Sequence, residues 1–128
     1  MSGRSPFQYA ALRIVPRVER GEAVNAGVVL FCRPRRFLGA RTQLDEELLA
    51  KLAPDLDLGA VRTTLHALEL IAAGDERGGP VAKLPASERF HWLVAPASTI
   101  VQPGPVHTGL TADPEGELRH IFARLVER

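Results

Sequence analysis

Two stretches near the start of the chain decide its fold: residues 7–19, FQYAALRIVPRVE, and residues 23–32, AVNAGVVLFC. Both are rich in β-branched and aromatic residues, and the glycine-centred segment RGE at residues 20–22 separates them. Two such runs joined by so short a connection predict a β-hairpin. The chain therefore opens with a two-stranded ribbon on which the rest must pack.

The two strands of this ribbon differ in polarity. Alternation gives the first strand an aliphatic face and a second face that carries Arg13 and Arg17. A three-residue turn places Arg17 opposite Asn25, and we prefer that register because a two-residue turn would mix polar and apolar faces. The second strand is apolar on both faces apart from Asn25, which indicates an interior strand covered at least partly on both sides.

Periodicity predicts the remaining elements. Residues 37–43 read as a third strand, and residues 89–95 as a fourth in which Trp92 anchors the core. Residues 98–102 and 106–111 read as shorter extended pieces. Helices are predicted at residues 45–52, at residues 58–73 after a cap at Asp55 or Asp57, and after Asp113 with Pro114 in the first turn.

This order of elements predicts an α+β domain with a mostly antiparallel sheet of about five strands, opened by the hairpin and continued as a meander. About three helices should pack on one face of that sheet. A length of 128 residues fits a single domain with its own core. We expect residues 1–6 to be a loose tail and residues 74–88 to form one long internal loop.

Composition limits the function classes. The net charge is +1, from 16 basic and 15 acidic residues, so the whole chain carries no bulk attraction for nucleic acid or anionic lipid. A single cysteine, Cys32, excludes a disulfide framework and should be buried. No apolar run reaches the length of a membrane span, and residues 1–6 lack the apolar core of a signal peptide, so we expect a cytoplasmic protein without a membrane partner.

Motifs of several enzyme classes are absent from the sequence. It has no glycine-rich phosphate loop, no cysteine or histidine pair at zinc spacing, and no serine-nucleophile elbow. We therefore expect neither a metal nor a cofactor.

The first candidate site is the polar strand face with Arg13, Arg17 and Asn25. Two guanidinium groups on long stems can converge on a phosphate, a carboxylate or an acidic partner surface, and the amide can orient it. The alternative is that both arginines pair with carboxylates of the chain itself, on Glu19, on Glu22 or on the acidic helices across the sheet.

The second candidate site lies in the later extended segments and comprises Arg89, His91, Gln102, His107 and Thr108. Histidine suits proton transfer near neutral pH, so two histidines with an amide and a hydroxyl could form an acid–base site. Two histidines alone supply too few ligands for a typical metal site. A solvent-exposed histidine on a strand is the simpler interpretation of His91.

A third cluster, Arg33, Arg35 and Arg36 beside Phe37, interleaves basic residues with an aromatic one. Such a pattern can bind nucleic acid, but the balanced charge and an aromatic content of 5% favour a solvated turn.

The residues also resemble a known family. The segment YAALRIVPRVERGE at residues 9–22 and NAGVVLFC at residues 25–32 resemble the opening of the bacterial domain of unknown function 3037. The segments FHWL, ST, QPGPVHTG and DP, within residues 90–114, resemble its closing half. The motif positions present here are Arg13, Arg17, Glu19, Asn25, Gly27, Gln102, His107 and Thr108.

The resemblance implies no activity and assigns no chemical role to these positions. It implies a small stand-alone bacterial protein, often encoded beside a HipA-like kinase, and hence a partner or regulator of such a kinase. Our leading hypothesis is a non-catalytic binding or regulatory protein, acting through protein–protein interaction or on an anionic ligand. The alternative is a small hydrolytic or phosphoryl-transfer enzyme that uses His91 and His107 with the arginines.

Overall fold

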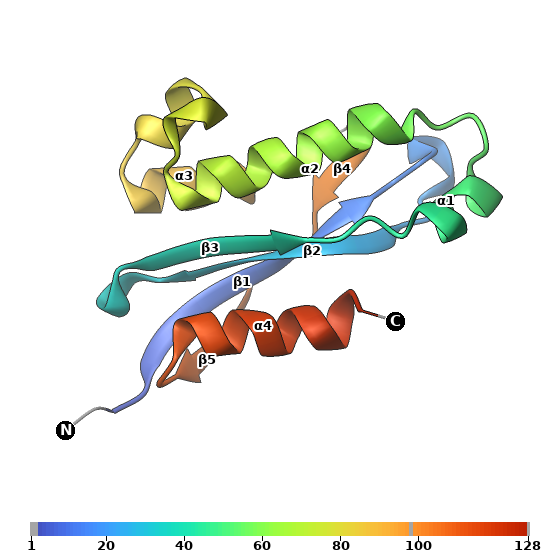
Figure 1. The fold of residues 1–128 in the computed structure, drawn as a ribbon. Helices are drawn as coiled ribbons and strands as arrows, with labels where there is room; N and C mark the ends of the chain where they lie inside the picture. Colours follow the sequence, from blue (N-terminus) through green and yellow to red (C-terminus); the bar gives the residue numbers. More distant parts are fainter. Residues whose placement is uncertain (1–2, 98, 128) are drawn as a thin grey trace.

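The computed structural model describes residues 3–97 and 99–127. These residues form an antiparallel sheet of five strands and four α-helices, which confirms the α+β class (Figure 1). The strands are β1 (Ser5–Ile14), β2 (Val24–Cys32), β3 (Phe37–Thr42), β4 (Val101–Pro103) and β5 (His107–Thr111). The helices are α1 (Glu46–Leu52), α2 (Leu58–Ala73), α3 (Ala86–Leu93) and α4 (Pro114–Leu125).

The sheet is organised around β1 and β2. Its order is β3-β2-β1-β4, and β5 pairs with the same edge of β1 as β4 does. β4 lies beside the second half of β1, and β5 lies beside the first half. The late segment from β4 to β5 therefore runs along the opening strand, so residues far apart in the sequence become neighbours.

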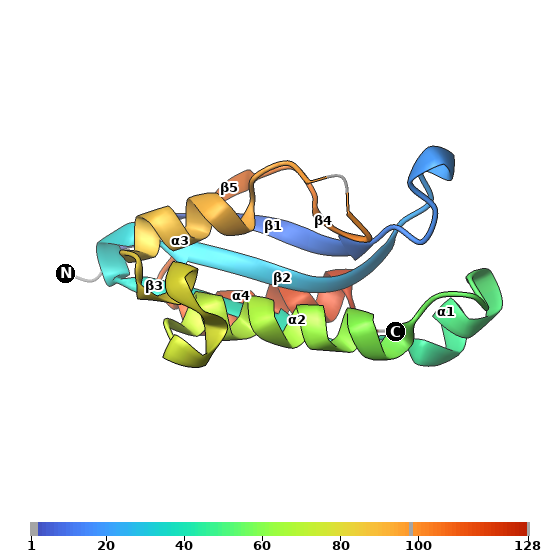
Figure 2. The ribbon, with the colours of Figure 1, turned by 90° about the horizontal axis from the view of Figure 1, so that it is seen from above.

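Helices cover both faces of this sheet. α2 and α3 lie on one face, which we call face A, and α4 lies on the other, face B (Figures 1 and 2). On face A, Leu12 and Val29 pack with Ile71 and Phe90; on face B, Val28 and Leu30 pack with Phe122. The expectation that helices would cover one face was wrong. The two-sided apolar pattern of β2 already indicated the second layer, because both of its faces need cover.

The predicted hairpin is present, but its register differs from the prediction. Arg13 lies opposite Asn25 and Ile14 opposite Val24, and the register shifts between Leu12 and Arg13. β1 ends before Pro16, which has no N–H to donate to a ladder. Residues 15–23 form the connection, with a 3₁₀ turn at Val18–Arg20. Arg17 thus lies outside the sheet.

Local sequence explains where three helices begin. The side chains of Asp45, Asp57 and Asp113 accept hydrogen bonds from Leu48 N, Ala60 N and Gly116 N, as N-cap residues do. α2 ends at Gly74, whose φ of 72° is the left-handed conformation that glycine adopts readily. The predicted helices at these positions are confirmed.

The strand predicted at residues 89–95 is wrong, because Ala86–Leu93 form α3. Phe90 and Leu93, three residues apart, are buried against face A, which is a helical spacing. The alternation of Phe90 and Trp92 suggested a strand, yet Pro85 followed by Ala, Ser and Glu is a helix start. Trp92 is 48% exposed and lines an apolar hollow beside α2, so it is not the core anchor that we expected.

Two segments expected to be irregular contain regular structure. β1 begins at Ser5, within the expected tail. The expected loop at residues 74–88 contains 3₁₀ turns at Glu76–Gly78 and Pro80–Lys83 and the start of α3. Among the described residues, no helix has the length and apolar character that a bilayer crossing requires.

Candidate functional site

A row of polar side chains crosses face B on three neighbouring strands, β2, β1 and β4. Arg13 of β1 lies opposite Asn25 of β2 on one side and opposite Gln102 of β4 on the other. Directly opposite residues in antiparallel strands point to the same face. We call Asn25, Arg13 and Gln102 the polar row. Its two ends are about 10 Å apart at the backbone, since neighbouring strands lie about 4.8 Å apart.

The guanidinium of Arg13 lies against Gly104, just beyond β4. A Cβ atom at Gly104 would be 2.9 Å from Cζ of Arg13, closer than such contacts normally come. The backbone N–H of Gly104 donates to the carbonyl of Ala11 at 2.7 Å, which fixes this loop beside β1. The absence of a side chain at Gly104 thus leaves the space that the guanidinium occupies.

Arg13 is half-buried, yet its guanidinium makes no hydrogen bond or ion pair within residues 3–97 and 99–127. Glu22 pairs instead with Arg20 at 3.0 Å. The expected alternative, in which Glu22 neutralises the arginines of the strand face, therefore does not occur. A half-buried cation without a carboxylate partner is a candidate binding group, because its N–H donors can be satisfied by an incoming anion.

Both amides of the polar row are held by backbone carbonyls. Asn25 Nδ2 donates to the carbonyl of Leu125 at 3.2 Å, which ties β2 to the end of α4. Gln102 Nε2 donates to the carbonyl of Thr99 at 2.7 Å. The row is thus a partly pre-organised surface, in which the amides flanking Arg13 have fixed orientations.

An aromatic pair extends this face along β1. His107 of β5 lies opposite Tyr9, and their ring centroids are 5.2 Å apart with an angle of 33° between the planes. Tyr9 packs on the face B core beside Phe7. The face therefore presents an imidazole tilted against a tyrosine ring near one half of β1 and the polar row near the other.

The structure brings together only part of the predicted site. Arg13, Asn25, Gln102 and His107 share face B. Arg17 is exposed in the connection after β1, and Thr108 lies opposite Gln8, one step out of phase with His107. By strand alternation Thr108 points to the other face of the sheet.

Arg89 and His91 lie away from this row, on α3 over face A. Arg89 Nη1 donates to the carbonyl of Leu84 at 3.0 Å, and His91 is exposed. His91 therefore lies on a helix over face A, whereas the side chain of His107 lies on face B. The arrangement gives no support to an acid–base site built from both histidines. No group of three or more His, Cys, Asp or Glu side chains able to hold a metal ion occurs within the described part of the chain.

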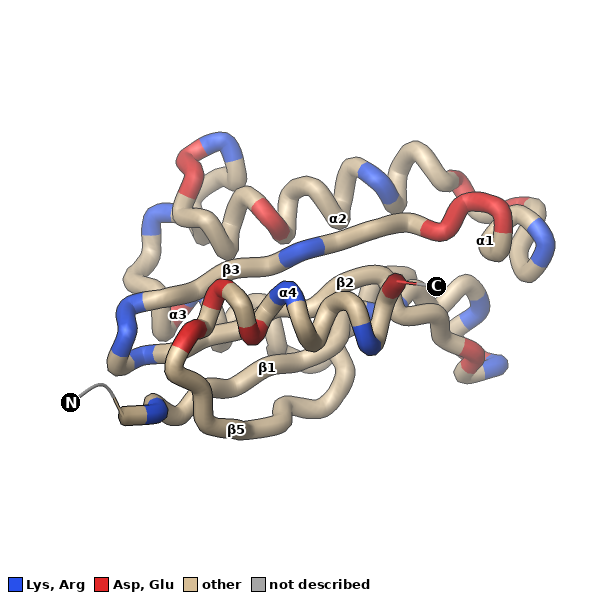
Figure 3. Tube along the Cα trace, turned by 60° about the horizontal axis from the view of Figure 1, so that its bottom comes forward, with Lys and Arg blue, Asp and Glu red and all other residues tan. Residues whose placement is uncertain are grey.

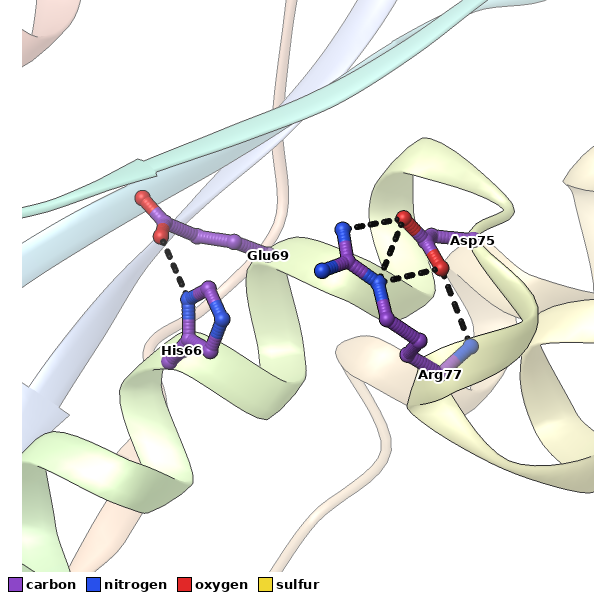
Figure 4. Close-up of polar contacts among 4 residues, drawn as sticks. All are labelled: His66, Glu69, Asp75 and Arg77. Atoms are coloured by element: carbon purple, nitrogen blue, oxygen red, sulfur yellow. Dashed lines mark hydrogen bonds and ion pairs between the residues drawn. The ribbon is translucent and has the colours of Figure 1, made fainter.

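Other charged side chains near α2 do have partners, as Figure 4 shows. Glu69 lies 3.8 Å from His66 Nδ1 and accepts a hydrogen bond from Thr42 N at 3.0 Å. Arg77 donates to both carboxylate oxygens of Asp75 through its side chain and also through its backbone N–H. These bonds lower the pKa of Asp75 from 3.8 to about 2. Arg13 differs from these residues in having no such partner in the described structure.

The arginine turn between β2 and β3 is a separate basic surface. Figure 3 shows basic residues gathered there, whereas acidic residues gather around α1 and the start of α2. Arg35 donates to Ser5 Oγ and to the carbonyl of Gly3, and Arg33 lies 5.5 Å from the centroid of the Phe31 ring. Phe31 is buried, so this turn offers no exposed ring there for stacking of bases.

Sequence reasoning left two residues of this face out of the candidate set, Tyr9 and Gly104. Tyr9 could have been included, because it is four residues before Arg13 and so shares its face. Gly104 could not, because the need for a missing side chain there depends on how the late segment lies beside β1.

The comparisons with known proteins identify the family. Residues 9–126 match the model of a protein of unknown function (DUF3037), which covers most of the chain. This chain belongs to that family. Neither a curated protein nor a solved structure matches it.

Proposed function

We propose that this protein is a non-catalytic binding domain, in which the polar row holds an anionic group of a partner protein. The observation that carries this proposal is Arg13, a half-buried guanidinium in the middle of the sheet with no partner among the described residues. Keeping a cation partly out of water is costly unless a counter-charge compensates for it. An anion bound from outside the chain supplies that compensation.

We further propose that the partner is a HipA-like kinase and that the domain regulates it. The family resemblance suggests this partner through the neighbouring gene, and the polar row supplies a surface through which one acidic group could be held. A bidentate guanidinium–carboxylate or guanidinium–phosphate contact would give such an interface its orientation.

Binding of the purified kinase to the wild-type domain, measured by calorimetry or surface plasmon resonance, tests both proposals. Arg13→Ala should weaken binding about tenfold to a hundredfold, which corresponds to one charge-assisted hydrogen-bonded contact. Arg13→Lys should recover only part of the loss, because an ammonium cannot make the bidentate contact.

Arg17→Ala is the matched control, since Arg17 has the same charge but lies outside the polar row. Its affinity should stay within about twofold of wild type, as expected for an exposed charge at a distance. Equal losses in the two variants would contradict the polar row as the contact surface. Kinase binding that neither Arg13 variant changes would do so too, and no binding at all would remove the kinase as the partner.

A further inference from the structure

β5 lies at the outer edge of the sheet, on the side opposite to the edge formed by β3. It pairs with β1 on one side, and no other strand within the described residues pairs with its outer side. Figures 2 and 3 show β5 at the outside of the fold, with none of the described helices beyond it. Backbone groups that point outward from β5 are therefore accessible to another chain.

The hydrogen bonds of β1 show which groups of β5 point outward. Ala11 accepts a hydrogen bond from Gly104 N, so the backbone groups of Ala11 point toward the late segment. Backbone direction alternates along a strand, so Tyr9 also points its groups to β5, and its partner His107 points back to β1. The N–H and C=O groups of the next residue, Thr108, therefore point away from the sheet.

This outer edge lacks the features that usually protect strand edges. Charged residues, proline or a covering element commonly prevent an edge strand from pairing with another chain. At the other edge, β3 carries Arg41, and Glu69 of α2 accepts a hydrogen bond from Thr42 N at 3.0 Å. β5 has the sequence HTGLT, without Lys, Arg, Asp, Glu or Pro. Its Leu110, two residues after Thr108, has a side chain that is 59% exposed, the largest fraction among the large apolar residues that the structure describes.

We infer that β5 pairs with β5 of a second copy of this chain, antiparallel about a two-fold axis at Thr108. In this register Leu110 lies opposite Val106 of the other copy, a residue directly before β5 that is 40% exposed. Two exposed apolar side chains thus cover each other on face A, and the two Thr108 side chains form a second favourable cross-strand pair. On face B, His107 lies opposite Gly109, which has no side chain to obstruct the imidazole. This inference does not rest on the proposed binding function.

The pattern of the strand favours a second copy and this register. The two apolar residues lie two positions on either side of Thr108, and such symmetry is what an isologous contact between identical chains requires. An axis at Gly109 would instead place Leu110 opposite Thr108 and leave Val106 exposed. The axis at Thr108 is therefore the one that removes the apolar side chains from water.

The size of the contact sets the expected affinity. Pairing of five residues from each copy buries less than about 1,200 Å², the lower end for specific stable interfaces. We therefore expect a dissociation constant of about 0.1–1 mM. The two-fold axis of an antiparallel pair within one sheet is perpendicular to that sheet, so both copies present face B on the same side. The dimer thus carries two polar rows on one surface.

Sedimentation equilibrium of the full chain between about 10 μM and 1 mM tests the inference. The weight-average mass should rise from 13.9 kDa toward twice that value. Leu110→Lys places a charge on the contact and should raise the dissociation constant about tenfold or more. Thr108→Pro should abolish association, because it removes the outward N–H, whereas the ladder to β1 uses His107 and Gly109.

Leu52→Lys is the matched control. Leu52 is 51% exposed on α1, at the other end of the molecule from β5 (Figure 1). Its dissociation constant should stay within about twofold of wild type, as for a surface change away from the contact. Thermal unfolding at about 10 μM, where the chain should be monomeric, checks that every variant folds.

Two cysteine variants locate the axis. Directly opposite residues of a hydrogen-bonded antiparallel pair have Cα atoms about 5.5 Å apart, within the range of a disulfide. In oxidised glutathione, Thr108→Cys should form a linked dimer about tenfold faster than Gln8→Cys. Gln8 is exposed on β1 beside Thr108, so its two copies would lie three strand spacings, about 14 Å, apart. Cys32 is buried and is the same in both variants.

Each outcome decides for or against pairing through β5. A mass that stays at 13.9 kDa up to about 1 mM would overturn the inference. A dimer that neither Leu110→Lys nor Thr108→Pro weakens forms through another surface, which also overturns it. Equal rates of linkage in the two cysteine variants contradict the axis at Thr108. Loss of association in both edge variants, its retention in Leu52→Lys and faster linkage through Thr108→Cys support the proposed dimer.

Discussion

At the scale of single residues, the binding face depends on a glycine as much as on an arginine. Gly104 has an ordinary backbone conformation, and its importance comes from the guanidinium of Arg13 that lies against it. Arg13 supplies the N–H donors, and the missing side chain at Gly104 leaves the space in which those donors lie. The two residues should therefore act as one unit in any binding measurement.

Gly104→Ala is expected to lower partner affinity without unfolding the protein. The new methyl group would lie 2.9 Å from Arg13 Cζ, so the guanidinium must move away. Stability should change by less than about 1 kcal/mol, because the position is partly exposed and a flexible side-chain end can shift. Affinity for the kinase, measured in single and double variants, checks this. Gly104→Ala should add little loss to Arg13→Ala, and full additivity would contradict the contact.

The Asp75–Arg77 pair gives a pH dependence with a definite sign. The pKa of Asp75 lies at about 2, below the ordinary 3.8, chiefly because Arg77 hydrogen-bonds to its carboxylate. A lowered folded-state pKa means stabilisation that is present above pH 3.8 and is lost as the pH falls toward 2. In urea unfolding, Asp75→Asn should be less stable than wild type at pH 6, and the gap should close at low pH. A gap independent of pH would show that the charge of Asp75 is not its cause.

At the scale of elements, the sequence predicted correctly the helices whose ends carry capping residues. Asp57 and Gly74 bound α2, and Asp113 with Pro114 opens α4, so propensity and capping determined both helices locally. The segment at residues 89–95 was predicted to be a strand. Over so short a length, its alternating aromatic residues fit both the period of a helix and the period of a strand. The helix-start signal at Pro85 and the packing of Phe90 and Leu93 on face A distinguish helix from strand.

The candidate site was predictable only in part for the same reason. Alternation placed Arg13 and Asn25 on one polar face, but the predicted register was wrong, because Arg13 and not Arg17 lies opposite Asn25. Arg17 lies outside the sheet because β1 ends before Pro16, which has no N–H to donate to a strand ladder. The contribution of Gln102 and His107 to this face depends on β4 and β5 pairing with β1, which is long-range information.

The cap of α2 tests how well local chemistry determines an element. Asp57 accepts a hydrogen bond from Ala60 N at 3.0 Å, so Asp57→Ala should lower the free energy of unfolding by about 1 kcal/mol. The side chain of Asp55, two residues earlier, makes no hydrogen bond or ion pair in the described structure, so Asp55 serves as the control. Asp55→Ala should cost no more than about 0.5 kcal/mol. Equal effects in thermal unfolding would mean that the charge near the helix end matters and the hydrogen bond does not.

At the scale of the whole molecule, the two central strands of one sheet contribute apolar side chains to a core on each face. Leu12 packs under α2 and α3 on face A, and Leu30 packs under α4 on face B. Both side chains come from the paired central strands β1 and β2, so neither core can form unless that pair forms. Face B then has a second role, because the strand pair that buries Leu30 at one end presents the polar row at the other.

This shared strand pair predicts a single unfolding transition. Leu12→Ala and Leu30→Ala remove side chains that are 1% and 0% exposed, and each should cost about 2–5 kcal/mol. Leu110→Ala is the matched control, because Leu110 is 59% exposed and should change stability by less than about 0.5 kcal/mol. Far-UV circular dichroism reports the whole chain, and the fluorescence of Trp92, the single tryptophan, reports the α3 side.

In urea, the two signals should change together for wild type and for both core variants. They should do so because losing either core exposes apolar surface on the same two strands. If Trp92 fluorescence changes at lower urea than circular dichroism in Leu12→Ala, face A unfolds on its own and the two cores are separable. In that case the polar row could persist on a partly unfolded chain. If the transitions coincide, the binding face exists only in the fully folded molecule.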